Sequence, residues 1–194
     1  MHILMMNSAF DSPCKSGIEH GSVKGMTTDL RYPIGKYEQP ASFSSVERTA
    51  AMEALAELPQ KMRAAVCGLS ETQIDTAYRE DGWTVRQTVH HVADGHMRAC
   101  VQLRMALTED WPAITPIKQN LWAELDDART QPVEPSLELL NALHLRWVAL
   151  LRSLPEIDWT ERGYTHPVKG RQTVEQIAAL YAWQGRHHTA QITT

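Results

Sequence analysis

The sequence lacks several features that would assign it to a specialised class of protein. Its 194 residues include only three cysteines, Cys14, Cys67 and Cys100, and none has the close spacing of a thiolate metal site or a disulfide framework. A reducing cytoplasm is the location that fits this cysteine usage best. The 19 lysine and arginine residues are outnumbered by 23 aspartate and glutamate residues. We therefore expect no nucleic acid partner, because binding phosphates normally needs a basic surface.

Long hydrophobic runs are also missing. The longest, residues 3–6 and 177–180, are far below the ~20 residues of a membrane-spanning helix, so we expect no membrane segment. The first residues do not have the basic start and apolar stretch of a secretory signal. Hydrophobic residues nevertheless make up 43% of the chain and charged residues 22%, which is an ordinary composition for a globular protein with a core.

The pattern of the chain changes near Met26. Residues 1–25 show no apolar period, so we expect residues 1–28 to be a disordered extension or the product of a mis-assigned start, with Met26 as the natural first residue. Residues 29–194 are expected to form a single domain. Up to residue 43 this domain mixes prolines and a glycine with aromatic residues, which predicts an extended arm that packs by its aromatic side chains.

From residue 44 onward the sequence predicts helices. Capping boxes, in which Ser or Thr is followed three residues later by Glu or Gln, begin near residues 44, 84 and 173 and precede apolar residues spaced three and four apart. A further helix is expected over 136–154, with Leu139, Leu140 and Trp147 among its inward-facing residues. A small hairpin or an irregular loop is expected over 164–174. Four long helices predict an all-α four-helix bundle. The extended arm precedes the bundle, and the alternative of a short hairpin before the last helix stays open.

The histidines are concentrated on two of these helices. Five of the nine lie there, and they are His90, His91, His96, His187 and His188. Imidazole is the commonest ligand of transition metals near neutral pH, and bundles build metal sites from inward-pointing side chains of facing helices. The helical period places Gln184 and His188 at successive inward positions of the last helix, and His91 on a polar strip of the helix after residue 84. Gly95 and Gly185 remove side-chain bulk near this expected centre.

Several segments resemble the YfiT branch of the DinB/YfiT-like superfamily. They are GWTVRQTVHHVAD at 82–94, YAWQGRHHTAQI at 181–192, RYPIGKY at 31–37 and WAEL at 122–125. The resemblance covers about residues 29–192. It implies a four-helix bundle, commonly a homodimer, with one divalent metal per chain, zinc or nickel, held by three histidines. Carried over residue by residue, two of these ligands match His91 and His188, whereas the third position holds Gln184 instead of histidine.

This departure leaves three explanations open for the third ligand position. In the first, Gln184 ligates through its amide oxygen, which is a weaker donor than imidazole for zinc or nickel. In the second, water fills the position. In the third, the site has lost its metal and is a binding pocket. His187 is a possible substitute, but its direction on the helix points about 100° away from Gln184 and His188.

The resemblance also implies an activity. Members of the branch are described either as metal-dependent hydrolases or as S-transferases that use the thiol bacillithiol, and related DinB-like proteins use mycothiol or glutathione. We therefore expect an enzyme that activates a low-molecular-weight thiol on a divalent metal and transfers it to a small-molecule substrate. One alternative is a hydrolase that uses metal-bound hydroxide. Another is a non-catalytic bundle with a degenerate metal site that binds a small molecule or a partner.

Three further residues are candidates for supporting roles in this chemistry. Asp94, three residues after His91, is a candidate acceptor for an imidazole N–H. Arg98 is a candidate contact for an anionic substrate. His166 lies just before the last helix and is a candidate for the mouth of the pocket. The alternative for each residue is an ordinary role: a solvated acid for Asp94, a surface ion pair for Arg98 and a loop position for His166.

Overall fold

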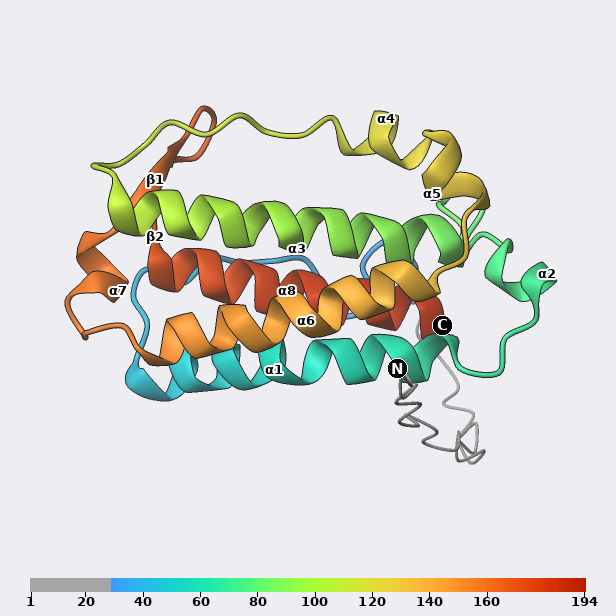
Figure 1. The fold of residues 1–194 in the computed structure, drawn as a ribbon, viewed down its shortest axis with the longest axis horizontal. Coiled ribbons are helices and arrows are strands. Elements are labelled where there is room, and N and C mark those ends of the chain that lie inside the picture. The colour runs from blue at the N-terminus through green and yellow to red at the C-terminus, as the bar shows by residue number, and fades with distance from the viewer. Residues whose placement is uncertain (1–28) are drawn as a thin grey trace, which may run out of the picture.

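The computed structural model describes residues 29–194, which form a bundle of four long helices (Figure 1). The long helices are α1 (Ser45–Val66), α3 (Val85–Thr108), α6 (Glu134–Arg152) and α8 (Val174–Thr193). The short elements are α2 (Glu71–Ile74), α4 (Gln119–Ala123), α5 (Asp126–Thr130), α7 (Asp158–Glu161), β1 (Gly163–His166) and β2 (Gly170–Thr173). The four-helix bundle predicted from the sequence is confirmed. The expected extension over residues 1–28 lies outside the described residues.

Local sequence explains where most of the helices begin. Helices α1, α2, α3 and α8 all start at capping boxes, whose first residues are Ser44, Ser70, Thr84 and Thr173. In each box the hydroxyl accepts a hydrogen bond from a backbone N–H of the first turn, and the Glu or Gln side chain accepts one in return. These bonds satisfy N–H groups that have no partner within the helix. Helix α6 instead has Pro135 in its first turn, where the missing N–H costs nothing.

The four long helices form a closed ring in the order α1, α6, α3, α8, since each contacts the two beside it. Helices α1 and α8 run in one direction and α3 and α6 in the other (Figure 1). Helices that follow one another in the chain, α1 and α3, or α6 and α8, therefore lie diagonally across the bundle. Because α3 and α6 are parallel, their connection has to return along the whole bundle, and it does so over α3, carrying α4 and α5 (Figure 1).

The hairpin before α8 anchors this long connection. Strands β1 and β2 are antiparallel, with Gly163 opposite Thr173 and His166 opposite Gly170, so the hairpin option of the sequence is the one the structure shows. The backbone N–H of Thr165 donates to the carbonyl of residue 112 at 2.9 Å, and the N–H of residue 114 donates to the carbonyl of Thr165 at 3.0 Å. The start of the connection is thereby fixed at the end of the bundle where α8 begins.

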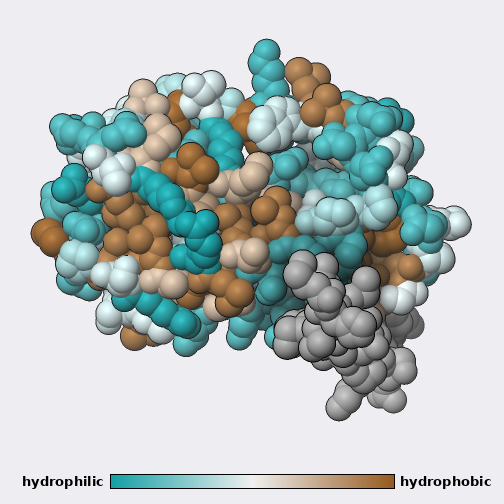
Figure 2. All heavy atoms as spheres, viewed as in Figure 1, coloured by the Kyte–Doolittle hydropathy of each residue, from teal (hydrophilic) through white to brown (hydrophobic). Residues whose placement is uncertain are grey.

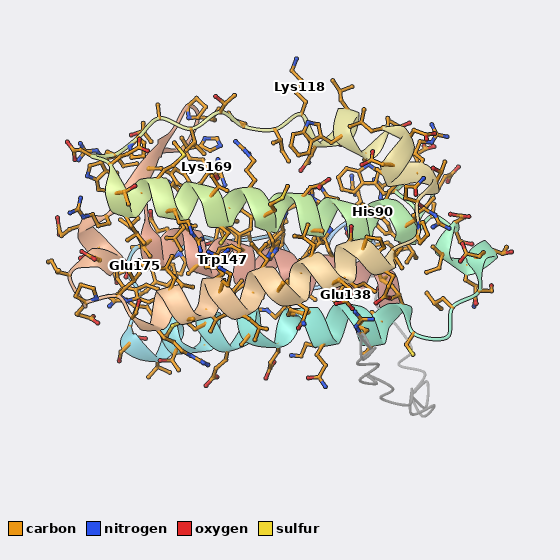
Figure 3. All side chains as sticks on the ribbon, viewed as in Figure 1. His90, Lys118, Glu138, Trp147, Lys169 and Glu175 are labelled. Atoms are coloured by element: carbon orange, nitrogen blue, oxygen red, sulfur yellow. The ribbon has the colours of Figure 1, made fainter. Side chains whose placement is uncertain are left out.

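The core fills the space enclosed by the ring. Trp147 of α6 is fully buried at its centre, packed with Leu55, Leu103 and Leu151 from three of the helices (Figure 3). On the face in Figure 2, hydrophobic and hydrophilic residues are interspersed over α3 and α6. Within residues 29–194, no helix combines the length and the apolar character needed to cross a membrane.

The N-terminal arm, residues 29–43, packs against α8 by its aromatic side chains, as the sequence predicts. The Tyr37 ring lies 5.6 Å from the Trp183 ring, and the Tyr32 ring 6.1 Å from the His187 ring, between centroids. The carbonyl of Arg31 accepts a hydrogen bond from the side chain of Gln191 at 3.3 Å. The arm is thus tied to the C-terminal half of α8.

Candidate metal centre

The antiparallel contact of α3 and α8 brings together the three residues that the sequence singled out. The rings of His91 and His188 lie 4.9 Å apart between centroids and are nearly perpendicular, at 77°. The Nε2 atoms of Gln184 and His91 are 3.5 Å apart. One early turn of α3 and the second half of α8 therefore supply the cluster. Its members lie side by side as expected, while their role as metal ligands stays a prediction.

Both imidazoles of the cluster are held in a dry environment. His91 is 6% exposed and His188 9% exposed. Burial lowers the pKa of His91 to about 4. Burial also lowers the pKa of His188 to about 3, and the neighbouring His91 ring adds to this effect. Both rings are therefore neutral near pH 7, which is the form that binds metals.

The orientation of the His188 ring is fixed by its neighbours. Its Nδ1 lies 2.8 Å from the side-chain oxygen of Gln191. Because an amide oxygen only accepts, Nδ1 carries the hydrogen and Nε2 keeps its lone pair. The amide nitrogen of Gln191 donates to the arm at Arg31. A hydrogen bond from the second ring nitrogen to an outer partner is typical of histidines that bind metals.

Gln184 contributes an amide group with an unsatisfied oxygen. Its Oε1 is buried and has no hydrogen-bond partner. The amide packs over Gly95, where a Cβ would lie 3.6 Å from its nitrogen and 3.9 Å from its oxygen. The expectation for Gly95 is therefore met at the cluster itself. Gly185 makes room elsewhere, because a Cβ there would lie 2.6 Å from the side chain of Leu58 on α1.

A pocket of about 290 Å³ opens beside the cluster. Its lining residues are Trp83, Gln119, Leu180, Tyr181, Trp183, Gln184, His187 and His188. The Trp83 ring lies 4.5 Å from the His91 ring and 6.4 Å from the His188 ring, so it covers both. His187 stacks on Trp183 at 4.6 Å, and its Nδ1 is buried without a partner. The mostly aromatic walls suit a small apolar molecule next to the histidine pair.

Of the three supporting candidates, Arg98 acts electrostatically on a residue of this pocket. Burial raises the pKa of the pocket residue Tyr181, and the positive charge of Arg98 offsets part of that rise. Asp94 instead lies near Asp127 of α5, and burial followed by that charge raises its pKa. No hydrogen bond connects Asp94 with His91 in the described part of the chain. The supporting roles of Arg98 and Asp94 stay predictions.

His166 has a local structural role in the hairpin. Its Nδ1 accepts hydrogen bonds from the backbone N–H groups of Val168 and Lys169, at 3.1 and 3.2 Å. Burial, and after it the charges of Lys169 and Arg98, lower the pKa of His166. The hydrogen bonds close the turn between β1 and β2. A role at the mouth of the pocket stays a prediction.

Two other histidines of α3, His90 and His96, make their hydrogen bonds outside the cluster. His90 binds the hydroxyl of Ser136 at 2.8 Å and the carbonyl of Gln131 at 3.1 Å, and so holds α3 against the start of α6 (Figure 3). His96 is fully buried and pairs with His144 of α6 at 2.9 Å. The sequence analysis missed His144, although it lies three residues before Trp147 and four after Leu140 on the inward face of α6.

The donor set of the cluster fits a divalent cation with one weak ligand. No three His, Cys, Asp or Glu side chains among residues 29–194 gather as a group that could hold a metal ion, and the third ligand position holds an amide. What is present is two neutral imidazoles and an amide whose oxygen has no partner. Zinc and nickel accept imidazole nitrogen readily and an amide oxygen less strongly.

Comparisons with known proteins identify close similarities. The sequence model of the DinB superfamily matches residues 54–192. A Geobacillus thermodenitrificans protein named "Putative metal-dependent hydrolase" is 46% identical over 163 residues, covering 84% of this chain and 92% of that protein. A Bacillus cereus protein of the same name is 45% identical, covering 86% and 95%. The structure of YfiT from Bacillus subtilis, described as "a probable metal-dependent hydrolase with an unusual four-helix bundle topology", matches with a TM-score of 0.82 and 43% identity, covering 85% of this chain and 94% of YfiT.

Proposed function

Because this chain belongs to the DinB superfamily, we propose that its histidine cluster is the centre of a metal-dependent thiol S-transferase, which joins a low-molecular-weight thiol to an electrophilic small molecule. The observation that carries the proposal is the pair of buried, neutral imidazoles, His91 and His188, at the wall of an aromatic pocket. The names of the similar proteins, which describe metal-dependent enzymes, support the metal.

In this proposal His91, His188 and Gln184 hold one divalent cation, zinc or nickel. A cation at these donors supplies a Lewis acid that favours the ionised form of a thiol at neutral pH. Three protein donors leave room for a substrate atom, as in catalytic rather than structural metal sites. Gln191 keeps the His188 lone pair directed inward through its hydrogen bond to Nδ1.

The lining of the pocket favours a thiol over water as the nucleophile. No aspartate or glutamate is among the described residues that line it. A thiol has a pKa near 8.5 and loses its proton without a strong base. Water is a much weaker acid, so its deprotonation needs a stronger base or a stronger effect of the metal. In the transfer, the sulfur–carbon bond forms as the leaving group departs with its electron pair, and the thiol proton passes to solvent. Trp83 and Trp183 offer flat apolar surfaces to the electrophile.

Hydrolysis is the second candidate, and one observation favours it beyond the names of the relatives. His187 lines the same pocket, and its buried Nδ1 has no hydrogen-bond partner. Burial lowers the pKa of His187, so the ring is neutral at pH 7 and able to accept a proton from water. The two candidates thus differ in whether His187 acts as a base.

The first test is the metal content of the protein. Tag-free protein purified without added metal is expected to contain close to one zinc or nickel per chain by inductively coupled plasma mass spectrometry. The variants His91→Ala and His188→Ala are expected to lose it, because each removes one of two imidazole donors. His166→Ala, which changes a histidine of the hairpin, is the matched control and should retain the metal. A metal-free parent protein that also fails to bind added zinc would overturn the proposal.

The second measurement separates transfer from hydrolysis. Metal-loaded protein is assayed with monochlorobimane and one thiol at a time, taken from bacillithiol, mycothiol and glutathione, and separately with a panel of activated esters. Thiol transfer predicts adduct formation that disappears in His188→Ala and survives in His187→Ala. Ester cleavage that disappears in His187→Ala, without thiol consumption, would select hydrolysis. Inactivity in both assays would leave the bundle as a binding protein.

A further inference from the structure

A buried chain of hydrogen bonds crosses the bundle and ends beside the candidate metal centre. The Nδ1 of His144 on α6 lies 2.6 Å from the backbone carbonyl of Leu55 on α1. The Nε2 of His144 lies 2.9 Å from the Nδ1 of His96 on α3. His144 is 1% exposed and His96 fully buried. We call these three groups the Leu55–His144–His96 relay.

The carbonyl at one end of the relay determines where every hydrogen lies. A carbonyl oxygen only accepts, so the Nδ1 of His144 carries the hydrogen and donates it to Leu55. A neutral imidazole has one hydrogen, so the Nε2 of His144 is an acceptor. His96 must therefore donate from its Nδ1, which leaves a lone pair on its Nε2. No acidic side chain hydrogen-bonds to either ring in the described part of the chain, so nothing compensates a second proton on either.

The relay ends in an acceptor that needs a donor. The Nε2 of His96 is buried and has no hydrogen-bond partner, and the same is true of the Oε1 of Gln184. The Gln184 amide packs over Gly95, the residue before His96. Burial lowers the pKa of His96, and the nearby Gln184 side chain offsets part of that lowering. Two acceptors beside each other are unfavourable, because a buried polar atom without a hydrogen-bond partner destabilises the folded state. The nitrogen of the Gln184 amide is a donor of the kind that the Nε2 of His96 lacks.

Turning the Gln184 amide by half a turn about its last side-chain bond exchanges its oxygen and nitrogen. The nitrogen then donates to the lone pair of His96. The oxygen takes the place next to the Nε2 of His91, from which the amide nitrogen is now 3.5 Å away. In the metal-free protein the oxygen accepts a hydrogen from that Nε2, and a bound cation would take the place of this hydrogen. We infer that the Leu55–His144–His96 relay holds Gln184 in this orientation, with its oxygen presented to the space between His91 and His188.

This orientation makes Gln184 an oxygen ligand and His96 and His144 positioning residues. An amide suits the position because one end donates to the relay while the other offers a lone pair to a cation. A glutamate there would place a carboxylate oxygen against the lone pair of His96. The ligand role rests on the proposed function, whereas the orientation itself is a property of the metal-free protein.

The orientation can be tested without any metal. In metal-free, ¹⁵N-labelled full-length protein, long-range ¹H–¹⁵N correlation spectra report which ring nitrogen of each histidine carries the hydrogen. We expect hydrogen on Nδ1 and none on Nε2 in both His96 and His144. A nitrogen–nitrogen coupling across the hydrogen bond between the Gln184 amide and the Nε2 of His96 is also expected. A hydrogen on the Nε2 of His96 would overturn the inference, whether or not the protein binds metal.

A double-mutant cycle tests whether the orientation matters for the metal. Zinc affinity is measured by competition with a chelator for the parent, His96→Leu, Gln184→His and the double variant, and thermal unfolding confirms that each is folded. His96→Leu is expected to weaken zinc binding roughly tenfold in the parent, as removal of outer partners of metal ligands does. In the Gln184→His background there is no amide to orient, and the loss should be much smaller.

Equal losses in both backgrounds would mean that His96 has only a structural role and would overturn the inference. If His96→Leu does not fold, the spectra of the parent protein still decide the orientation. If the parent binds no zinc, the proposed function fails, while the tautomers and the coupling to Gln184 separately confirm or overturn the orientation.

Discussion

At the scale of single residues, the chemistry of the candidate centre depends on Gln184. His91 and His188 offer strong, neutral donors, and burial keeps them in that form. The amide at the third position is a weaker donor for zinc and nickel. We therefore expect a metal that is held by two strong contacts and one weak contact, and whose affinity is limited by residue 184.

The first prediction concerns this limit. Gln184→His should raise the affinity for zinc by roughly tenfold or more, because imidazole is a better donor than an amide oxygen for this metal. Competition with a chromophoric chelator measures the change. Gln119→His, which makes the same substitution on another wall of the pocket, is the control and should leave the affinity unchanged. An unchanged affinity in Gln184→His would place the metal, if any, elsewhere.

The helical period was sufficient to predict that His91, Gln184 and His188 would meet, because inward positions of two packed helices face one another. It was not sufficient for the relay. His96 and His144 lie 48 residues apart, and whether their rings touch depends on how far α3 is shifted along α6. That shift is set by packing of the whole core, which no local pattern encodes.

At the scale of helices, two glycines inside helices have opposite structural reasons. Gly95 faces the Gln184 amide at an ordinary contact distance, where a methyl group fits. Gly185 faces Leu58 of α1, where a methyl group would overlap the leucine. Both glycines lose the same backbone conformational entropy on folding. The two positions therefore differ only in how tightly their neighbours pack against them.

Matched alanine substitutions test this difference. Gly95→Ala is expected to stabilise the protein by up to about 1 kcal/mol through helix propensity. Gly185→Ala is expected to destabilise it by about 1–3 kcal/mol, because Leu58 has to move in a packed core. Urea unfolding followed by tryptophan fluorescence measures both. Changes of the same sign in the two variants would contradict the contacts described for them.

The sequence predicted most helix starts and was less accurate for α6. A capping box depends only on residues three positions apart in the sequence, and each box predicted from the sequence is present. Helix α6 has no side-chain cap and begins at Glu134, two residues earlier than expected. The inward direction expected for Leu139 was wrong, since it is 37% exposed, whereas Leu137 and His144 are buried. The apolar period there is ambiguous because Leu139 and Leu140 are adjacent.

At the scale of the whole molecule, the order of the helices around the ring follows from long-range packing rather than from the sequence pattern. Placing α1 diagonally to α3 lets α3 face α8, and this contact assembles the candidate centre. The same arrangement places His144 between α1 and α3. The interior of the bundle therefore contains several imidazoles that are kept neutral, and this has a consequence for stability.

The last prediction is that the metal-free protein loses stability steeply in mild acid. Burial lowers the pKa of His91 and of His144 to about 4, and that of His188 to about 3. In the unfolded chain each is near 6.5, so below that pH the unfolded state binds more protons than the folded state. The stabilisation is complete above about pH 6.5 and is lost as the pH falls towards the folded-state values.

At pH 5 each of these three histidines should lower the free energy of unfolding by about 2 kcal/mol relative to pH 7.5. Their sum is comparable to the lower end of the free energy of unfolding of a typical domain, which is about 5–15 kcal/mol. Urea unfolding at a series of pH values measures the effect. His166→Ala serves as the comparison, because its ring lies on the hairpin outside the core. The pKa of His166 is also lowered, but its substitution should remove less of the pH dependence than substitution of any of the three buried histidines. A free energy of unfolding that stays constant between pH 7.5 and 5 would mean that these rings are protonated in the folded protein, and a protonated ring at His91 or His188 is unable to bind a metal.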